Sequence, residues 1–169
     1  MIEFRKAIIG DIHSIAEIYN EAVLNTTATF DTEEKTIENR TRWLVERNEN
    51  FPVTVALLNN KIAGYAALNP WSDKKAYDIT AEISLYVEYE SRGKGIGKKL
   101  IEVIVNTAVQ HTQLHSLIAR ITEGNEASIY LHEINGFIKT GKMKEVGIKF
   151  GKLLDVTIMQ KMLRAKEII

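Results

Sequence analysis

The stretch TAEISLYVEYESRGKGIGKKL, residues 80–100, joins a strand pattern to a helix pattern through a glycine-rich loop. Apolar and polar residues alternate through residues 80–87, which predicts a strand with Ala81 and Ile83 on one face and Glu82 on the other. From Ile96 to Ala108, apolar side chains recur at helical spacing. The sequence therefore predicts a strand that passes through a short loop into a helix.

The loop between them carries Gly93, Gly95 and Gly97, and glycines at such positions allow a ligand to approach the backbone closely. Amide groups at the start of the following helix attract phosphate. A P-loop is excluded because Lys99 stands where Ser or Thr is needed, and a dinucleotide fingerprint is excluded because Lys98 replaces its third glycine. A solvated surface turn is the alternative interpretation. The basic side chains of the loop are Arg92, Lys94, Lys98 and Lys99.

The rest of the chain alternates strand and helix patterns. Asp11 is expected to cap a first helix, and Asn125 to open a later helix that Gly136 ends. Two apolar runs that meet at Asn59-Asn60 predict a hairpin. This order predicts an α/β (α+β) class, with a sheet packed by helices. The remaining predicted elements are a strand over residues 1–6, a helix over 37–48, hairpin strands over 53–58 and 62–68, and strands over 117–121, 137–146 and 153–162.

Composition limits the function classes. The chain has 169 residues, with 22 Lys and Arg against 22 Asp and Glu, and it contains no cysteine. The length predicts a single domain over residues 1–169, and the missing cysteine excludes disulfides, thiolate metal sites and cysteine nucleophiles. No metal site is expected. Zero net charge argues against a protein that coats nucleic acid. Without a signal peptide or an apolar run of about 20 residues, we expect a cytoplasmic protein with no membrane partner.

The motif Arg92-Gly93-Lys94-Gly95-Ile96-Gly97, placed after a strand, resembles the acetyl-CoA pyrophosphate loop of the GNAT N-acetyltransferases. The segments TAEISLYV (80–87), NEASIYLHEINGF (125–137) and GIKFGKLLD (147–155) resemble the branch of phosphinothricin and methionine-sulfoximine N-acetyltransferases, as do TATF (27–30), PW (70–71) and AY (76–77). The resemblance covers nearly the whole chain in order. It implies the GNAT fold, a mixed central sheet splayed at the acetyl-CoA site and flanked by helices.

The resemblance implies acetyl-CoA as co-substrate and assigns residues to its parts. The pantetheine arm would pair with the backbone of Leu85, Tyr86 and Val87, where an N–H could also polarise the thioester carbonyl. Asn125 would cap its helix, bond the pantetheine arm, or do both. The implied pyrophosphate ligands are Arg92, Gly93, Lys94, Gly95, Ile96 and Gly97.

Two side chains are candidates for proton transfer. Glu82 lies within a strand, where glutamate is depleted, and a partly buried carboxylate holds a proton more readily than a solvated one, which suits a base. Burial statistics alone favour a solvated Glu82, whereas the resemblance implies the catalytic carboxylate, acting directly or through water. His132 stands where most GNAT enzymes carry a tyrosine near the sulfur. The resemblance therefore implies that His132 protonates the leaving thiolate.

The acceptor is expected to be a small amine of the phosphinothricin, methionine sulfoximine or methionine sulfone type. Relatives often carry two arginines in the loop after Pro-Trp, where this chain has Ser72 and Lys74. Lys74 is therefore the candidate for the acceptor carboxylate, as a point charge rather than a bidentate fork. Phe30 and Tyr77 are candidates for the pocket wall, with plain packing an equal alternative.

These assignments predict direct acetyl transfer from acetyl-CoA to the acceptor amine in a ternary complex. The alternatives are a protein or peptide N-acetyltransferase of the same fold and a non-catalytic CoA-binding module. The loop with Lys74 and Lys75 argues mildly against basic peptides. A homodimer is expected from the resemblance alone.

Overall fold

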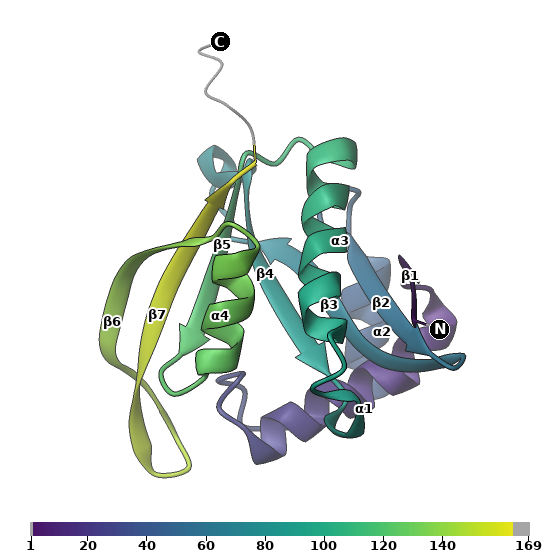
Figure 1. Cartoon of the computed structure of the whole chain (residues 1–169), viewed down its shortest axis with the longest axis horizontal. Helices are drawn as coiled ribbons and strands as arrows, with labels where there is room; N and C mark the ends of the chain where they lie inside the picture. The colour runs from purple at the N-terminus through teal and green to yellow at the C-terminus, as the bar shows by residue number, and fades with distance from the viewer. Residues whose placement is uncertain (1, 164–169) are drawn as a thin grey trace.

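The computed structural model describes residues 2–163, and Figure 1 shows a twisted sheet with helices packed against it. The strands are β1 (Ile2–Lys6), β2 (Val53–Leu58), β3 (Lys61–Pro70), β4 (Thr80–Val87), β5 (Ser116–Thr122), β6 (Ile138–Lys149) and β7 (Lys152–Met162). The helices are α1 (Ile12–Asn25), α2 (Ile37–Val45), α3 (Ile96–His111) and α4 (Glu126–Ile134). This element order and the mixed α/β class confirm the sequence-based prediction.

The sheet has the strand order β1-β2-β3-β4-β5-β7-β6. Neighbouring strands are antiparallel except β4 and β5, which are parallel. The β4–β5 ladder ends at Glu82 opposite Ile118, although β4 continues to Val87 and β5 to Thr122. Figure 1 shows these two strands close at one end and diverging toward the other. The edge of β4 over residues 83–87 is therefore left open on the β5 side.

Alternation along β4 separates two apolar cores. Ala81 and Ile83 belong to the core under α3, together with Leu100 and Ile104 of that helix. Tyr86 packs against the other core, which α1 covers. In Figure 1, α3 and α4 lie beside each other in front of the sheet, and α2 lies behind it. The predicted assignment of faces is confirmed, and Glu82 lies on the face opposite Ala81.

The hairpin turn and the two ends of α4 agree with the local predictions. Asn59 and Asn60 have φ of 51° and 64°, and two left-handed residues in succession form a type I′ hairpin turn. Gly136 has φ of 82° directly after α4, as expected of a residue that ends a helix. The side chain of Asn125 accepts a hydrogen bond from the Ser128 amide at 3.2 Å and caps α4 as predicted.

Two local predictions were only partly right. Asp11 is the N-cap residue of α1 as predicted, but its side chain makes no cap there; its carboxylate instead accepts from Arg5 at 2.7 and 2.8 Å and from the Ile8 amide at 2.9 Å. A salt bridge to the neighbouring strand thus replaces the cap. The second helix ends at Val45 rather than at residue 48, and the side chain of Arg47 beyond it donates to backbone carbonyl groups of residues 51 and 68.

Candidate active site

Two cavities meet where β4 and β5 diverge. The larger, of about 770 Å³, lies between the glycine loop, α4 and the end of α1. The smaller, of about 470 Å³, lies among β4, β5, β7 and the segment that joins α1 to α2. A ligand in the larger cavity can reach the smaller one along the open edge of β4. The residues that line both cavities are Ala28, Leu85, Tyr86, Asn125 and Ser128.

The glycine loop presents its backbone to the larger cavity. Gly93 and Gly95 have φ of 77° and 79°, a region that side chains rarely adopt, and a Cβ on either would meet nothing within 4 Å. Gly95 is the N-cap residue of α3 and offers no side-chain cap. The first amide groups of α3 are therefore available to an anion, which is the arrangement that binds pyrophosphate. Gly97 lets α4 approach, because its Cβ would lie only 3.1 Å from Leu131.

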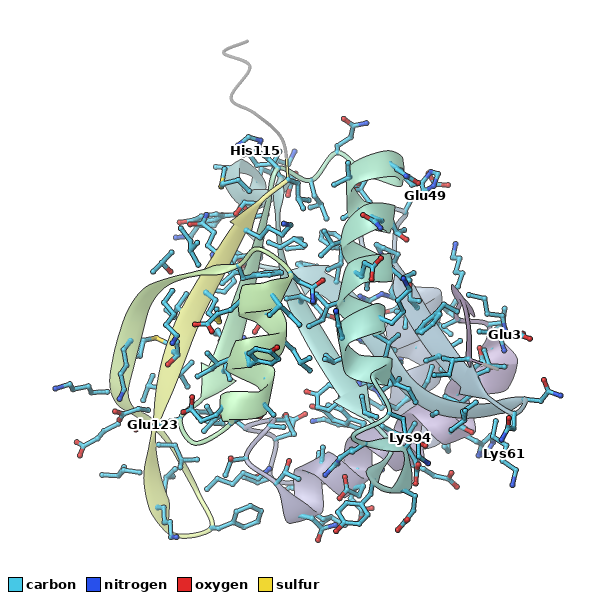
Figure 2. The ribbon with its side chains drawn as sticks, viewed as in Figure 1. Glu3, Glu49, Lys61, Lys94, His115 and Glu123 are labelled. Carbon is cyan, nitrogen blue, oxygen red and sulfur yellow. The ribbon has the colours of Figure 1, made fainter. Side chains whose placement is uncertain are left out.

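The basic side chains of the loop also hold the loop itself. Arg92 pairs with Glu21 of α1 at 2.9 Å and donates from Nε to the Val87 carbonyl at 3.1 Å. Lys94, labelled in Figure 2 on the loop that leads into α3, donates to the Glu90 carbonyl at 2.9 Å. Arg92 and Lys98 line the larger cavity, whereas Lys94 is not among the described residues that do. Two basic residues thus border this cavity beside the first amide groups of α3.

Glu82 lines the smaller cavity and forms an ion pair there. Arg120 of β5 donates from Nε and Nη2 to the two Glu82 carboxylate oxygens, each at 2.6 Å. This hydrogen bond raises the pKa of Arg120 above its ordinary value, against the lowering effect of burial. Both residues line the cavity. The pair places a carboxylate and a guanidinium side by side in this cavity, and no sequence pattern indicates the guanidinium.

His132 of α4 lies at another wall of the same cavity and is 3% exposed. Its Nδ1 lies 2.8 Å from the Ser128 carbonyl oxygen, so Nδ1 carries the proton and donates. Nε2 is buried without a hydrogen-bond partner in the described structure. Burial lowers the pKa of His132, and the Ser128 hydrogen bond opposes this only in part. The lowered pKa favours the neutral ring, in which Nε2 carries a lone pair.

A cluster of aromatic rings forms the wall on the α1 side. Tyr86 of β4 contacts Tyr19 and Tyr65, with ring centres 5.1 and 5.4 Å away. Burial raises the pKa of Tyr19 to about 12, so its hydroxyl stays protonated and donates to Asp31. The guanidinium of Arg40 lies over the Tyr19 ring at 4.6 Å. Helical periodicity places Arg40 on α2, but the sequence alone gives no sign that it would be buried beside these rings.

The residues predicted to bind the acceptor lie in two different regions of the structure. Phe30 lines the smaller cavity, and its ring lies against Gly147 of β6, where even a Cβ would be 2.2 Å away. Lys74 and Tyr77 are exposed on the loop between β3 and β4 and are not among the described residues that line this cavity. The structure therefore brings together Glu82, His132 and Phe30 and leaves the two loop residues apart.

The helix start can bind a pyrophosphate, and the unpaired edge of β4 leads from it to the second cavity. This is the arrangement that a transferase using a CoA thioester requires. Among the described residues, no group of three or more potential metal ligands occurs. Within residues 2–163, no helix is long and apolar enough to cross a membrane.

Comparison with known proteins gives the family. A family model described as acetyltransferase (GNAT) domain matches residues 5–158. The L-amino acid N-acyltransferase MnaT of Escherichia coli is 38% identical over 94% of this chain and 92% of its own length. The L-methionine sulfoximine/L-methionine sulfone acetyltransferase of Pseudomonas paraeruginosa is 39% identical over 92% of this chain and 91% of its own. The chain therefore belongs to the GNAT acetyltransferase family, whose members use acetyl-CoA as co-substrate.

A solved structure agrees with this assignment. The crystal structure of a phosphinothricin acetyltransferase of the GNAT superfamily from Sinorhizobium meliloti, in complex with AcCoA, aligns with a TM-score of 0.90 at 35% identity. The alignment covers 95% of this chain and 88% of that one. The fold, the enzyme class and the family resemblance inferred from sequence are thus confirmed.

Proposed function

We propose that this chain transfers acetyl from acetyl-CoA to the amino group of a small amino-acid-like acceptor by direct attack in a ternary complex. The observation that carries the proposal is the junction of the two cavities at the open edge of β4. Glu82 and His132 both line the smaller cavity, which that edge reaches. Thioester and amine can therefore meet between them without an acetylated enzyme residue.

Two parts of acetyl-CoA match features of the larger cavity. Its pyrophosphate would bind the amide groups of residues 93–97 at the start of α3. Its pantetheine arm would pair with the open backbone of Leu85, Tyr86 and Val87, as an added strand does. Asn125 caps α4 through its side-chain oxygen, which leaves the amide nitrogen to donate to the same arm. Both roles expected of Asn125 are thus compatible.

The reaction needs two protons to move. Glu82 takes one from the acceptor ammonium, and the neutral nitrogen then attacks the thioester carbon while a β4 backbone N–H stabilises the developing oxyanion. As the C–N bond forms and the C–S bond breaks, the attacking nitrogen loses its second proton and the leaving thiolate gains a proton. His132 can carry this proton from nitrogen to sulfur through the lone pair of Nε2. A neutral His132 must collect a proton before it can give one to sulfur.

The size of the smaller cavity and the relatives favour the acceptor class. About 470 Å³ is within the usual range for small-molecule sites. The relatives' names specify L-amino acids, methionine sulfoximine or sulfone, and phosphinothricin. All of these acceptors carry an anionic group close to a primary amine, so we extend this class to the present chain.

The test is an acceptor screen in which CoA release is read as free thiol. We expect thiol release with methionine sulfone, methionine sulfoximine or phosphinothricin, and none with peptides that bear a free N-terminus or a lysine. Release with the peptides alone would favour the protein N-acetyltransferase alternative. Calorimetric binding of acetyl-CoA without release for any amine would identify a non-catalytic CoA-binding module.

A further inference from the structure

Arg120 differs from the other guanidinium of the smaller cavity. The Lys, Arg, Asp and Glu side chains that line this cavity are Arg40, Glu82 and Arg120. Arg40 is buried, with the ring centres of Tyr19 and Trp43 at 4.6 and 4.3 Å from its guanidinium carbon. The Arg120 side chain is 50% exposed, and that of its partner Glu82 is 20% exposed. In this ion pair, the guanidinium is the group that an incoming anion can reach.

Arg120 also has more donors than Glu82 uses. A guanidinium carries five N–H groups, and Glu82 engages one on Nε and one on Nη2. No other described group accepts a hydrogen bond from Arg120. Trp71 lies with its ring 5.6 Å from the guanidinium carbon, a cation–π contact that favours one orientation. The edge formed by Nη1 and the second N–H of Nη2 can therefore bind another carboxylate, while Nε and the first N–H of Nη2 keep Glu82.

This edge complements an α-amino acid. Such an acceptor carries its amine and its carboxylate on one carbon, and the Glu82 carboxylate lies directly beside the Arg120 guanidinium. A carboxylate on Arg120 would therefore place the adjacent amine at Glu82. The zwitterion adds one charge of each sign, so its binding leaves the net charge of the cavity unchanged. An amine without the carboxylate cannot contact Arg120, so its nitrogen is not directed to Glu82.

We propose that Arg120 binds the carboxylate, or an equivalent anionic group, of the acceptor and so directs its amine to Glu82. The inference rests on the proposed function and names the residue that selects the acceptor. It assigns to β5 the contact that the sequence alone placed on Lys74. Lys74 is exposed on the β3–β4 loop, and the described lining of the cavity does not include it.

The experiment compares two acceptors, methionine sulfone and the same molecule without its carboxylate. The ratio of their kcat/KM values is measured for the wild type, Arg120→Gln and Arg120→Lys. Arg120→Gln should lower the preference for the carboxylate acceptor by about 10- to 100-fold, the usual effect of a charge-assisted hydrogen bond. Arg120→Lys should lie between, because lysine keeps the charge without the fork. The ratio cancels any general loss of rate that follows from freeing Glu82.

Lys74→Gln tests the rival residue under the same conditions. An unchanged ratio in Arg120→Gln, or a drop in Lys74→Gln instead, would overturn the proposal. If the wild type acetylates neither acceptor, the proposed function has failed, and calorimetric titration with methionine sulfone decides the binding claim. Binding by the wild type but not by Arg120→Gln supports it, and equal or absent binding in both overturns it. Acetyl-CoA binding checks that each variant is folded.

Discussion

Glu82, Arg120 and His132 line the smaller cavity in different environments. Glu82 and Arg120 form an ion pair through two hydrogen bonds, whereas the Nε2 of His132 is buried and has no hydrogen-bond partner among the described residues. Alternation along one strand was enough to predict which way Glu82 points. Arg120 lies 38 residues further along the chain, and nothing in the local pattern indicates that these two residues meet. Pairing between distant strands decides the environment of the carboxylate.

Glu82→Gln removes the proton acceptor while keeping the size of the side chain. We expect kcat for acetyl transfer to fall by about 100-fold or more, the range of a lost general base. The Kd of acetyl-CoA should stay unchanged, because Glu82 is not among the described residues that line the larger cavity. Steady-state kinetics and calorimetry measure the two quantities. Glu38→Gln, at an exposed ion pair on α2, is the matched control. Wild-type kcat in Glu82→Gln would refute the assignment of the base.

His132 should make stability depend on pH. Burial lowers its pKa below the ordinary value of 6.5, so as the pH falls below about 6.5 the unfolded chain binds a proton that the folded chain does not. The contribution of a neutral His132 is thus present above pH 6.5 and is lost as the pH falls through the folded-state pKa. We expect His132→Gln to lose less Tm than the wild type between about pH 7.5 and about pH 5.5.

Thermal unfolding followed by circular dichroism measures this difference. His13→Gln, at an exposed position, is the control for loss of a histidine as such. Equal declines of Tm in the wild type and in His132→Gln would contradict the prediction.

At the scale of elements, contacts from β5 and β6 hold the segment between α1 and α2 over the smaller cavity. Lys149 of β6 donates to the Thr29 carbonyl at 2.8 Å, and Thr122 of β5 donates to the Thr27 carbonyl at 2.7 Å. The ring of Phe30 fills the space that Gly147 leaves. Periodicity predicted the strands and helices themselves, whereas the loop that forms this wall has no periodic pattern, and only its packing against β5 and β6 gives it a place.

Gly147→Ala should displace Phe30, because the new Cβ would lie 2.2 Å from its ring. We expect a loss of stability of about 1–3 kcal/mol, typical of overpacking, and a higher KM for the acceptor with an unchanged Kd for acetyl-CoA. Gly141→Ala in the same strand is the control, since its Cβ meets nothing within 4 Å. Thermal unfolding and acceptor kinetics measure both effects. Equal effects of the two substitutions would show that Gly147 leaves no special space for Phe30.

For the whole molecule, the decisive feature is the divergence of β4 and β5, which lets one open strand edge serve two cavities. The pairing of the strands ends at Glu82, so the open edge begins next to the carboxylate proposed as base. This geometry favours the simultaneous presence of both substrates, and the chain contains no cysteine to carry an acetyl group between them.

The rate should therefore depend on both substrates in a sequential manner. We expect intersecting double-reciprocal plots when acetyl-CoA is varied at several acceptor concentrations, because both substrates must be bound before attack. Mass spectrometry of enzyme incubated with acetyl-CoA alone should show no acetylated protein. Parallel plots together with a stable acetyl-enzyme would contradict direct attack.

The expected homodimer stays a prediction. Light scattering on the purified protein should give twice the mass of the chain at micromolar concentration. The mass of a single chain would contradict it.

The amino-acid sequence by itself determined the order of strands and helices, the two faces of β4 and the glycine loop that opens α3, and its resemblance to known sequences indicated the family. The structural features depend on local periodicity and on the left-handed conformations that glycine adopts, both of which can be recognised in a short segment. Only the tertiary structure decided that Glu82 is paired with Arg120, that Arg40 lies among aromatic rings and that Lys74 lies away from the cavity. Such contacts depend on how separate strands and loops pack, and short-range patterns carry no information about that packing.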